Sequence, residues 1–260
     1  MIRVGVVGAT GRMGREVCRA VDADPDLALV AAVSHSAPGS SLADAIGLET
    51  EAGAVVLVDR LDDMLDADID VLVDFTSPPY ASDHIAWGIA NGAHVVVGTT
   101  GFEIDDAWRE APVGVVVAPN FAIGAVLLMR FAEQAARHLP SAEVIELHHD
   151  RKVDSPSGTA LLTARRIAAA RNDRPADVGG DDAHPGARGA DVDGVRVHSV
   201  RLPGLVAHEE VVFGGEGQTL TLRHDSTDRT SFMPGVLLAI KAAPSRPGLT
   251  VGLEALLEQG

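Results

Sequence analysis

The first half of the chain alternates short, valine-rich apolar runs with segments that carry a helical pattern. Near-continuous apolar runs between helices are typical of parallel strands in a sheet that is covered on both faces. The predicted strands are Ile2–Val7, Ala28–Val33, Val55–Val58, Val71–Phe75, His94–Val97 and Val113–Val117. Each is followed by a segment that we predict to be a helix, so we expect a doubly wound α/β domain with a parallel sheet.

The pattern changes after Asn120. The predicted elements there are a helix over Ile123–Leu139, a strand over Ala142–His149, a helix over Gly158–Ala170 and strands over Val195–Arg201, Leu205–Phe213 and Gln218–His224. A passage rich in Gly, Asp and Pro, 172–194, is predicted to be loop, and the tail from Phe232 returns to helix with an interruption at 243–248. Sequential strands joined by Gly and Pro turns favour an antiparallel or mixed sheet, so we expect a second, α+β domain.

The charge balance narrows the classes of partner. The 260 residues include 37 Asp and Glu against 21 Lys and Arg, a formal net charge of −16, and Lys152 and Lys241 are the only lysines. A chain this acidic lacks the basic surface that nucleic acids and anionic membranes attract, so we expect neither as a partner. The sequence leaves two explanations of the acidity open: solubility alone, or adaptation to a salt-rich cytoplasm.

The cysteine content and the apolar runs bear on the compartment. The single cysteine, Cys18, excludes a disulfide scaffold and a multi-cysteine zinc site. The first residues have the pattern of a buried strand rather than of a signal peptide. No apolar stretch reaches the ~18 residues of a membrane span. We therefore expect a cytoplasmic protein.

A glycine-rich turn links the first predicted strand to the first helix. Gly8, Gly11 and Gly14 are spaced G-x-x-G-x-x-G. Glycines at such a turn let the backbone approach a pyrophosphate, and the helix N-terminus supplies N–H groups and the positive end of its dipole. The alternative is a tight turn without a ligand. The position of the turn in the first βα unit favours dinucleotide binding, and therefore a Rossmann-like domain.

Other strand ends carry residues suited to the same ligand. The second strand ends in Ser34, His35 and Ser36, without the carboxylate that holds the ribose of NAD. These side chains can donate hydrogen bonds to a 2′-phosphate, so we expect NADPH as the preferred cofactor, with NADH possible; the alternative is that they only cover the adenine edge. Three later strand ends, at Phe75–Thr76, Gly98–Thr100 and Ala118–Phe121, are predicted to contact ribose and nicotinamide, although each alone could be an ordinary turn.

Cationic residues concentrate at one place in this acidic chain. His148-His149-Asp150-Arg151-Lys152 follows a predicted strand, and Ser157-Gly158-Thr159 then begins a helix. Cations together with a free helix N-terminus predict an anion site for a small substrate with carboxylates. Metal binding is not expected, because adjacent histidines on a strand point to opposite faces and no third ligand follows at a recognisable spacing. A solvated turn with a simple helix cap remains the alternative.

Two classes of dehydrogenase are excluded by residue type. The single tyrosine, Tyr80, is not followed by lysine four residues later, as short-chain dehydrogenases require. Cys18 lies in the first helix, where a packing role is expected rather than that of a substrate nucleophile. Direct hydride transfer with a His or Lys acid remains. Open alternatives are a non-catalytic dinucleotide-binding module and a dehydrogenase for a different small acid.

One segment carries a specific resemblance. Glu146-Leu147-His148-His149, followed by Lys152-Val153-Asp154 and Pro156–Ala160, is similar to the 4-hydroxy-tetrahydrodipicolinate reductase (dihydrodipicolinate reductase) family. Further matches span the whole chain: Gly8–Gly14, Asp74–Thr76, Gly98–Phe102, Asn120, Phe121, Gly124, Arg201, His208, Glu209, His224, Arg229 and Phe232. The resemblance implies NAD(P)H-dependent reduction of 4-hydroxy-2,3,4,5-tetrahydrodipicolinate to 2,3,4,5-tetrahydrodipicolinate in lysine and diaminopimelate biosynthesis.

The resemblance also implies roles for residues. His148 would be the proton donor and acceptor, and Lys152 a proton donor that also favours the charged substrate. The carboxylate of a small dicarboxylate substrate would be held by His149, Ser157, Gly158 and Thr159. The implied cofactor-binding residues are Gly8, Ala9, Thr10, Gly11, Arg12, Met13, Ser34, His35, Phe75, Thr76, Gly98, Thr99, Thr100, Ala118, Pro119, Asn120 and Phe121.

The resemblance further implies a domain division and an assembly. Residues 1–121, completed by 233–260, would form the dinucleotide-binding domain, and residues 122–232 the substrate-binding and oligomerisation domain. Family members are usually homotetramers that assemble through the second domain's sheet. The chain departs from many relatives at Ser34, where they carry an acidic residue, and at Ala207, where they carry glycine. The first departure leaves the use of NADH in question.

Overall fold

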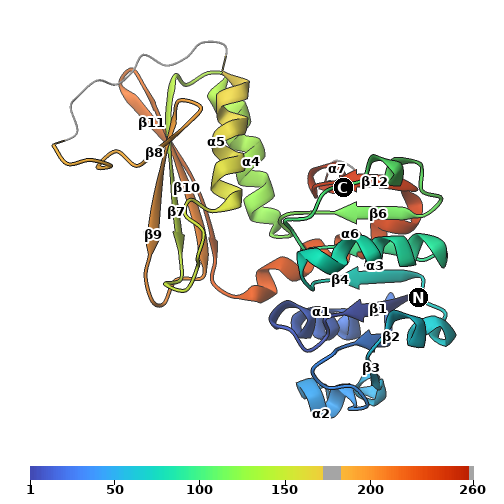
Figure 1. Ribbon diagram of the computed structural model, residues 1–260. Helices are drawn as coiled ribbons and strands as arrows, with labels where there is room; N and C mark the ends of the chain where they lie inside the picture. The colour runs from blue at the N-terminus through green and yellow to red at the C-terminus, as the bar shows by residue number, and fades with distance from the viewer. Residues whose placement is uncertain (172–182, 258–260) are drawn as a thin grey trace. The chain divides into compact units, whose positions relative to one another are not determined.

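The computed structural model describes residues 1–171 and 183–257 and divides into two compact units (Figure 1). Unit 1 comprises Met1–Phe121 with Phe232–Gly260, and unit 2 comprises Ala122–Ser231. The first eleven residues of the passage predicted to be loop, 172–182, lie outside the described residues. Which unit binds the dinucleotide and which the substrate remains a prediction.

Unit 1 is built on a seven-stranded parallel sheet with the order β12-β6-β5-β4-β1-β2-β3. Its strands are β1 (Ile2–Val7), β2 (Leu27–Val33), β3 (Leu57–Val58), β4 (Val71–Asp74), β5 (His94–Val97), β6 (Gly114–Val117) and β12 (Gly248–Val251). The strand order reverses at β1, which pairs with both β2 and β4. The doubly wound α/β fold predicted from the apolar runs is therefore confirmed.

The valine runs form the core of this sheet because both faces are covered. Val95, Val96 and Val97 of β5 are fully buried, as are Val115 and Val116 of β6. The helices of unit 1 are α1 (Arg12–Ala23), α2 (Leu42–Ile46), α3 (Pro78–Ala90), α6 (Met233–Ala242) and α7 (Glu254–Leu257). Since all strands run in parallel, their carboxyl ends meet at one edge of the sheet, where loops place ligand contacts.

Several connections differ from the prediction. The segments after β3 and β5 are 3₁₀ turns, η2 (Leu61–Ala67) and η3 (Asp106–Glu110), and not α-helices; a further one, η1 (Glu51–Ala54), precedes β3. The tail also contains β12, where helix was expected. Gly248, at φ +83°, turns the chain out of a short 3₁₀ segment, η5 (Ala243–Ser245), and starts a strand that pairs with β6.

Unit 2 contains a five-stranded mixed sheet with the order β11-β10-β7-β9-β8. Its elements are α4 (Ile123–Ala136), β7 (Ser141–His148), α5 (Gly158–Ala170), β8 (Ala190–Val192), β9 (Val195–Arg201), β10 (Ala207–Gly215), β11 (Gln218–Ser226) and η4 (Arg229–Phe232). The predicted mixed sheet is confirmed, but β8 lies inside the passage predicted to be loop. Its three residues, Ala190–Val192, are too few to show a strand pattern.

Helices α4 and α5 cover one face of this sheet (Figure 1). Residues Leu128 and Ile167 of the helices pack on Val144 of β7 and Phe213 of β10 in one apolar core. Side chains alternate between the faces of a strand, so Glu146 and His148 lie on the same face of β7 as Val144. This places polar residues on the helix-covered face at the carboxyl end of β7.

Candidate functional site

The glycine turn of unit 1 brings the start of α1 close to the end of β1. Gly8 has φ +80°, and a Cβ placed on Gly14 would lie 2.0 Å from the Gly8 carbonyl oxygen. Only glycines fit this contact, and it leaves Gly11 and Arg12 exposed at the first turn of the helix. The exposed backbone and the dipole of α1 fit a pyrophosphate group. Of the other predicted residues of this turn, Ala9 is buried and Met13 is half-buried.

Three hydroxyl groups meet where β2 ends. Thr10 Oγ1 lies 2.5 Å from Ser34 Oγ and 2.8 Å from Ser36 Oγ, and the two serine oxygens are 3.0 Å apart. His35 is exposed, with its Nδ1 2.7 Å from the Oδ1 atom of Asp59. The structure thus joins the predicted Thr10 and Ser34. It also places the carboxylate of Asp59 beside His35, a contact that the sequence did not predict.

A buried carboxylate ties together two of the predicted strand-end turns. Asp74 is fully buried and accepts hydrogen bonds from Thr76 N at 2.9 Å, from Thr99 Oγ1 at 2.6 Å and from the Nδ1 atom of His84 on α3. Burial raises the pKa of Asp74, but the hydrogen bonds from His84 and Thr99 outweigh burial and hold it below its ordinary value. Asp74 therefore stays ionised and fixes both turns.

The remaining predicted cofactor residues lie at the same edge of the sheet. The Phe75 and Phe121 rings are tilted, with centroids 5.6 Å apart. A Cβ on Gly98 would lie 2.0 Å from the Phe75 ring, so any larger residue there would displace this ring. The others follow β5 and β6: Thr100 and Pro119 are exposed, Asn120 is half-buried, and Ala118 is buried.

In unit 2 a second buried carboxylate holds His148. Glu146 is fully buried, and its Oε2 atom lies 2.5 Å from Nδ1 of His148. Arg201 donates to both oxygens of Glu146, at 2.8 and 2.7 Å, and Ser157 N donates at 3.2 Å. Burial raises the pKa of Glu146, but the bonds from His148 and Arg201 lower it to about 2. The resemblance had matched Glu146 and Arg201 without giving either a role.

The other predicted residues of unit 2 follow β7 closely. His149 Nδ1 is enclosed and makes no hydrogen bond to the residues that the structure describes; burial and the charge of Arg151 lower the pKa of His149. Lys152 Nζ lies 2.8 Å from Asp154 Oδ1, and this bond lowers the pKa of Asp154.

The start of α5 lies next along the chain. Ser157 caps the helix by accepting a hydrogen bond from Ala160 N at 3.2 Å, while Gly158 is exposed and Thr159 half-buried. The exposed first turn of this helix is suited to an anion. The six residues predicted for catalysis and substrate binding therefore lie together, between the end of β7 and the first turn of α5 in unit 2.

Three further points of the sequence prediction concern Cys18, clusters of metal ligands and membrane-spanning helices. Burial raises the pKa of Cys18 to about 12, which agrees with a packing role. Over residues 1–171 and 183–257, no three His, Cys, Asp or Glu side chains gather as metal ligands. No helix in the same ranges has the length and apolarity to cross a membrane.

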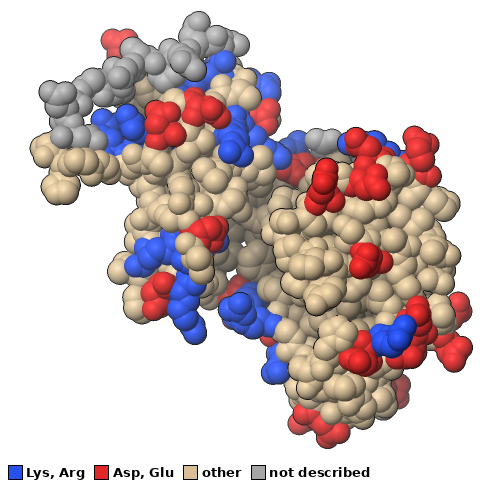
Figure 2. Space-filling view, in the orientation of Figure 1, with Lys and Arg blue, Asp and Glu red and all other residues tan. Residues whose placement is uncertain are grey.

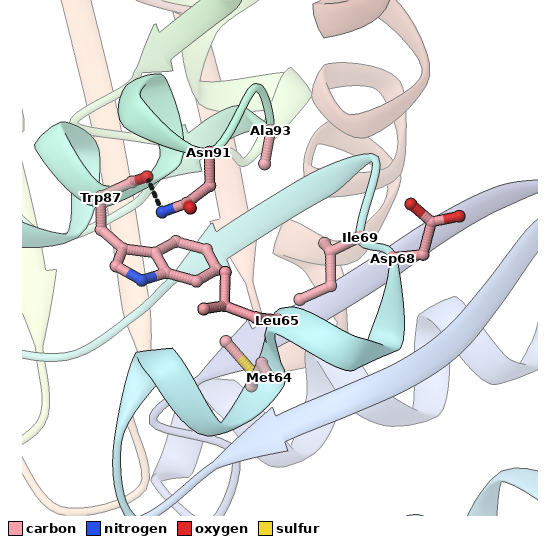
Figure 3. Close-up of a pocket in the computed structure, with 7 residues that line it drawn as sticks. All are labelled: Met64, Leu65, Asp68, Ile69, Trp87, Asn91 and Ala93. Atoms are coloured by element: carbon pink, nitrogen blue, oxygen red, sulfur yellow. Dashed lines mark hydrogen bonds between the residues drawn. The ribbon is translucent and has the colours of Figure 1, made fainter.

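A small pocket of about 80 Å³ opens near the amino ends of β4 and β5, the opposite edge from the glycine turn (Figure 3). It contains none of the predicted site residues. Its lining is Met64, Leu65, Asp68, Ile69, Trp87, Asn91 and Ala93.

The parallel sheet with its glycine turn, together with the buried His–carboxylate site, defines a nicotinamide dinucleotide-dependent oxidoreductase. Family models described as dihydrodipicolinate reductase, N-terminus, and dihydrodipicolinate reductase, C-terminus, match residues 2–121 and 124–257. The chain belongs to the dihydrodipicolinate reductase family. Its reaction is the NAD(P)H-dependent reduction of 4-hydroxy-2,3,4,5-tetrahydrodipicolinate to 2,3,4,5-tetrahydrodipicolinate, in lysine and diaminopimelate biosynthesis.

Similar proteins support this assignment along the full length. The 4-hydroxy-tetrahydrodipicolinate reductase of Nocardia farcinica is 52% identical over 268 residues, covering 99% of both chains. That of Mycobacterium sp. (strain KMS) is 50% identical over 265 residues, with the same coverage. A dipicolinate-bound dihydrodipicolinate reductase from Paenisporosarcina sp. TG-14 is 41% identical, with a TM-score of 0.86 over 98% of this chain and 99% of that one. The family resemblance predicted from the His148–Thr159 segment is confirmed.

Proposed function

We propose that His148 is the proton donor of the reduction. The observation that carries this role is the contact of its Nδ1 atom with the buried, ionised Glu146, because it directs Nε2 away from the protein's own acceptor. The His148 side chain is 16% exposed, so a ligand can contact it. The 4-hydroxyl leaves the ring as water together with a ring proton, which makes the ring conjugated. When bound, the reduced dinucleotide would supply a hydride to C4 of this ring. His148 then delivers a proton to the negative charge that develops toward the ring nitrogen.

Substrate binding is proposed for the residues around the start of α5. A small dicarboxylate substrate fits a site with the exposed helix N-terminus at Gly158 and Thr159, the hydroxyl of Ser157 and the ammonium group of Lys152. The Nδ1 atom of His149, which makes no hydrogen bond to the described residues, is a further group that a carboxylate can satisfy. The dipicolinate in the Paenisporosarcina relative supports this choice of ligand. Lys152 would also serve as a second proton donor.

NADPH is proposed as the preferred cofactor, with NADH as a possible one. The glycine turn and the exposed start of α1 would hold the pyrophosphate, and Phe75, Thr76, Gly98–Thr100 and Ala118–Phe121 the nicotinamide half. At the ribose, the hydroxyls of Thr10, Ser34 and Ser36 would donate to a 2′-phosphate. An acidic residue at position 34 would repel that phosphate, and this chain has none there.

A homotetramer in the cytoplasm is proposed as the working form. The face of the five-stranded sheet that α4 and α5 leave uncovered carries half-buried Ile145, Leu147 and Val212. Half-buried apolar residues on an open sheet face suit an interface with further copies of the chain. The mass of the purified protein in solution tests this: a value near four times 27.0 kDa is expected, and a monomer contradicts it.

A coupled assay tests the proposed roles. The protein is mixed with freshly generated 4-hydroxy-tetrahydrodipicolinate, and the oxidation of NADPH and of NADH is followed separately. We expect a higher kcat/KM with NADPH. We expect His148→Ala to lower kcat by roughly 10²–10⁴, the usual contribution of a positioned acid, and Lys152→Ala to raise KM as well. A His148→Ala variant with wild-type kcat would overturn the role of His148.

A further inference from the structure

Two glutamates lie opposite each other on the helix-covered face of the sheet in unit 2. Glu146 of β7 pairs in register with Glu209 of β10, and both side chains are buried. Buried carboxyl groups are costly unless their hydrogen bonds are satisfied. The two differ in their partners, because Glu146 contacts His148, Arg201 and Ser157 N, whereas Glu209 contacts Thr163 Oγ1 at 2.5 Å.

We propose that Glu146 is a positioning residue for His148, which it holds with Nδ1 protonated and Nε2 directed at the substrate. This inference rests on the proposed role of His148 as the proton donor. A neutral imidazole carries one N–H, and the nitrogen that bonds to the carboxylate keeps it. Glu146 thereby sets which ring nitrogen is free to exchange a proton with a ligand.

The geometry of β7 brings the two side chains together. His148 follows Glu146 by two residues, so both lie on the same face of the strand. Glu146 has no exposure, and its contact with His148 is therefore not shared with solvent. A carboxylate that orients a histidine in this way needs to be fixed itself.

Arg201 supplies that fixation from β9. It donates to both oxygens of Glu146, in the bidentate arrangement that restricts a carboxylate most strongly. The Nη2 atom of Arg201 also donates to the backbone oxygen of Asp154 at 2.8 Å, and Asp154 pairs with Lys152. Arg201 therefore links the support of His148 to the loop that carries the second proposed proton donor. The Ser157 N bond adds the start of α5 to the same network.

Glu209 offers a matched control. It is also a buried glutamate, on the neighbouring strand, and among the described residues it accepts a hydrogen bond from the Thr163 hydroxyl rather than from His148. Replacing it by glutamine removes a buried carboxyl group without touching the support of His148. A general effect of losing such a group would appear in both variants, whereas loss of positioning appears in Glu146→Gln alone.

The experiment uses the full-length protein with three variants: Glu146→Gln, Glu209→Gln and His148→Ala. The coupled assay gives kcat and KM, and titration with pyridine-2,6-dicarboxylate gives a Kd. ¹⁵N NMR of the imidazole nitrogens reports the neutral tautomer of His148, with His148→Ala identifying its signals. We expect Glu146→Gln to lower kcat about 10- to 100-fold, a part of what a positioned acid contributes. The Kd should change little, and the preference for the Nδ1–H tautomer should be lost. Glu209→Gln should match the wild type in all three measurements.

The outcomes separate the inference from the function on which it rests. Wild-type kcat in Glu146→Gln, with His148→Ala impaired, would overturn the positioning role alone. Wild-type kcat in His148→Ala would overturn the proposed role of His148. If Glu146→Gln fails to fold, the wild-type spectrum still decides, since a neutral His148 protonated at Nε2 contradicts the inference.

Discussion

At the scale of single residues, neighbouring glutamates of unit 2 differ in charge. Glu146 receives bonds from a histidine and an arginine, which hold it ionised, with a pKa of about 2. No cation of the described residues bonds to Glu209, so burial raises its pKa to about 7, against the opposing bond from Thr163. The backbone oxygen of Thr159 lies 3.1 Å from Thr163 Oγ1 and can accept the single proton of the Thr163 hydroxyl. A protonated Glu209 can then donate to the hydroxyl oxygen.

This difference predicts a dependence of stability on pH. The pKa of Glu209 is raised from 4.5 to about 7 on folding, so its contribution is complete below about pH 4.5 and is lost as the pH rises through 7. The full loss is about 3 kcal/mol, at about 1.4 kcal/mol per pH unit. Glu209→Gln has no such titration. Urea unfolding at pH 5 and pH 8 should therefore show the variant gaining stability over the wild type at pH 8. An equal difference at both pH values would contradict this.

At the scale of elements, the glycine turn depends on close packing between the start of α1 and the end of β1. A methyl group on Gly14 would lie 2.0 Å from the Gly8 carbonyl oxygen. Gly14→Ala should therefore displace the first turn of α1. We expect NADPH binding to weaken at least about tenfold, by roughly 1.4 kcal/mol. The affinity of unit 2 for the dicarboxylate should stay unchanged. Titration calorimetry with each ligand measures both. Gly214→Ala is the control, because its added Cβ would meet Ser141 only at 4.0 Å. Unchanged NADPH affinity in Gly14→Ala would refute the packing argument.

The elements also show how far the sequence predicts the fold. The buried strands were found because their valine runs are long and uninterrupted. The three-residue β8 was missed because so few residues show no period. The strand β12 was missed because its first residue, Gly248, belongs to the segment 243–248 that was predicted to interrupt a helix. The connections η2 and η3 were predicted to be α-helices. Local turns keep them short: η2, for example, is followed by Asp68, which has φ +50°.

The candidate site was predicted where its residues are close in sequence, as in 148–159. Roles that depend on register between strands were not predicted. Arg201 reaches Glu146 because β9 lies parallel to β7, with Arg201 opposite His148. Asp74 and His84 are ten residues apart and meet only because α3 packs back on β4. Asp74 lies in the predicted strand Val71–Phe75 and among the residues that match the family, but neither signal gives it a role.

At the scale of the whole molecule, the acidity is distributed over the surface. Figure 2 shows acidic side chains spread over the visible face of unit 1 with few basic ones between them. Both lysines are held by carboxylates: Lys241 pairs with Asp24 and Asp26, and Lys152 with Asp154. The net charge of −16 therefore leaves many carboxylates without a cation and produces self-repulsion in the folded state.

Salt should relieve this repulsion, because the Debye length falls from about 10 Å at 0.1 M to about 3 Å at 1 M. We expect the Tm of the protein to rise between 0.1 and 2 M KCl, beyond the rise in an uncharged osmolyte of equal osmolality, which controls for exclusion from the surface. Calorimetry at pH 7.5 measures both series. A Tm that responds equally to KCl and to the osmolyte would mean that repulsion contributes little to stability. The acidic surface would then serve solubility alone, and adaptation to a salt-rich cytoplasm would be excluded as its explanation.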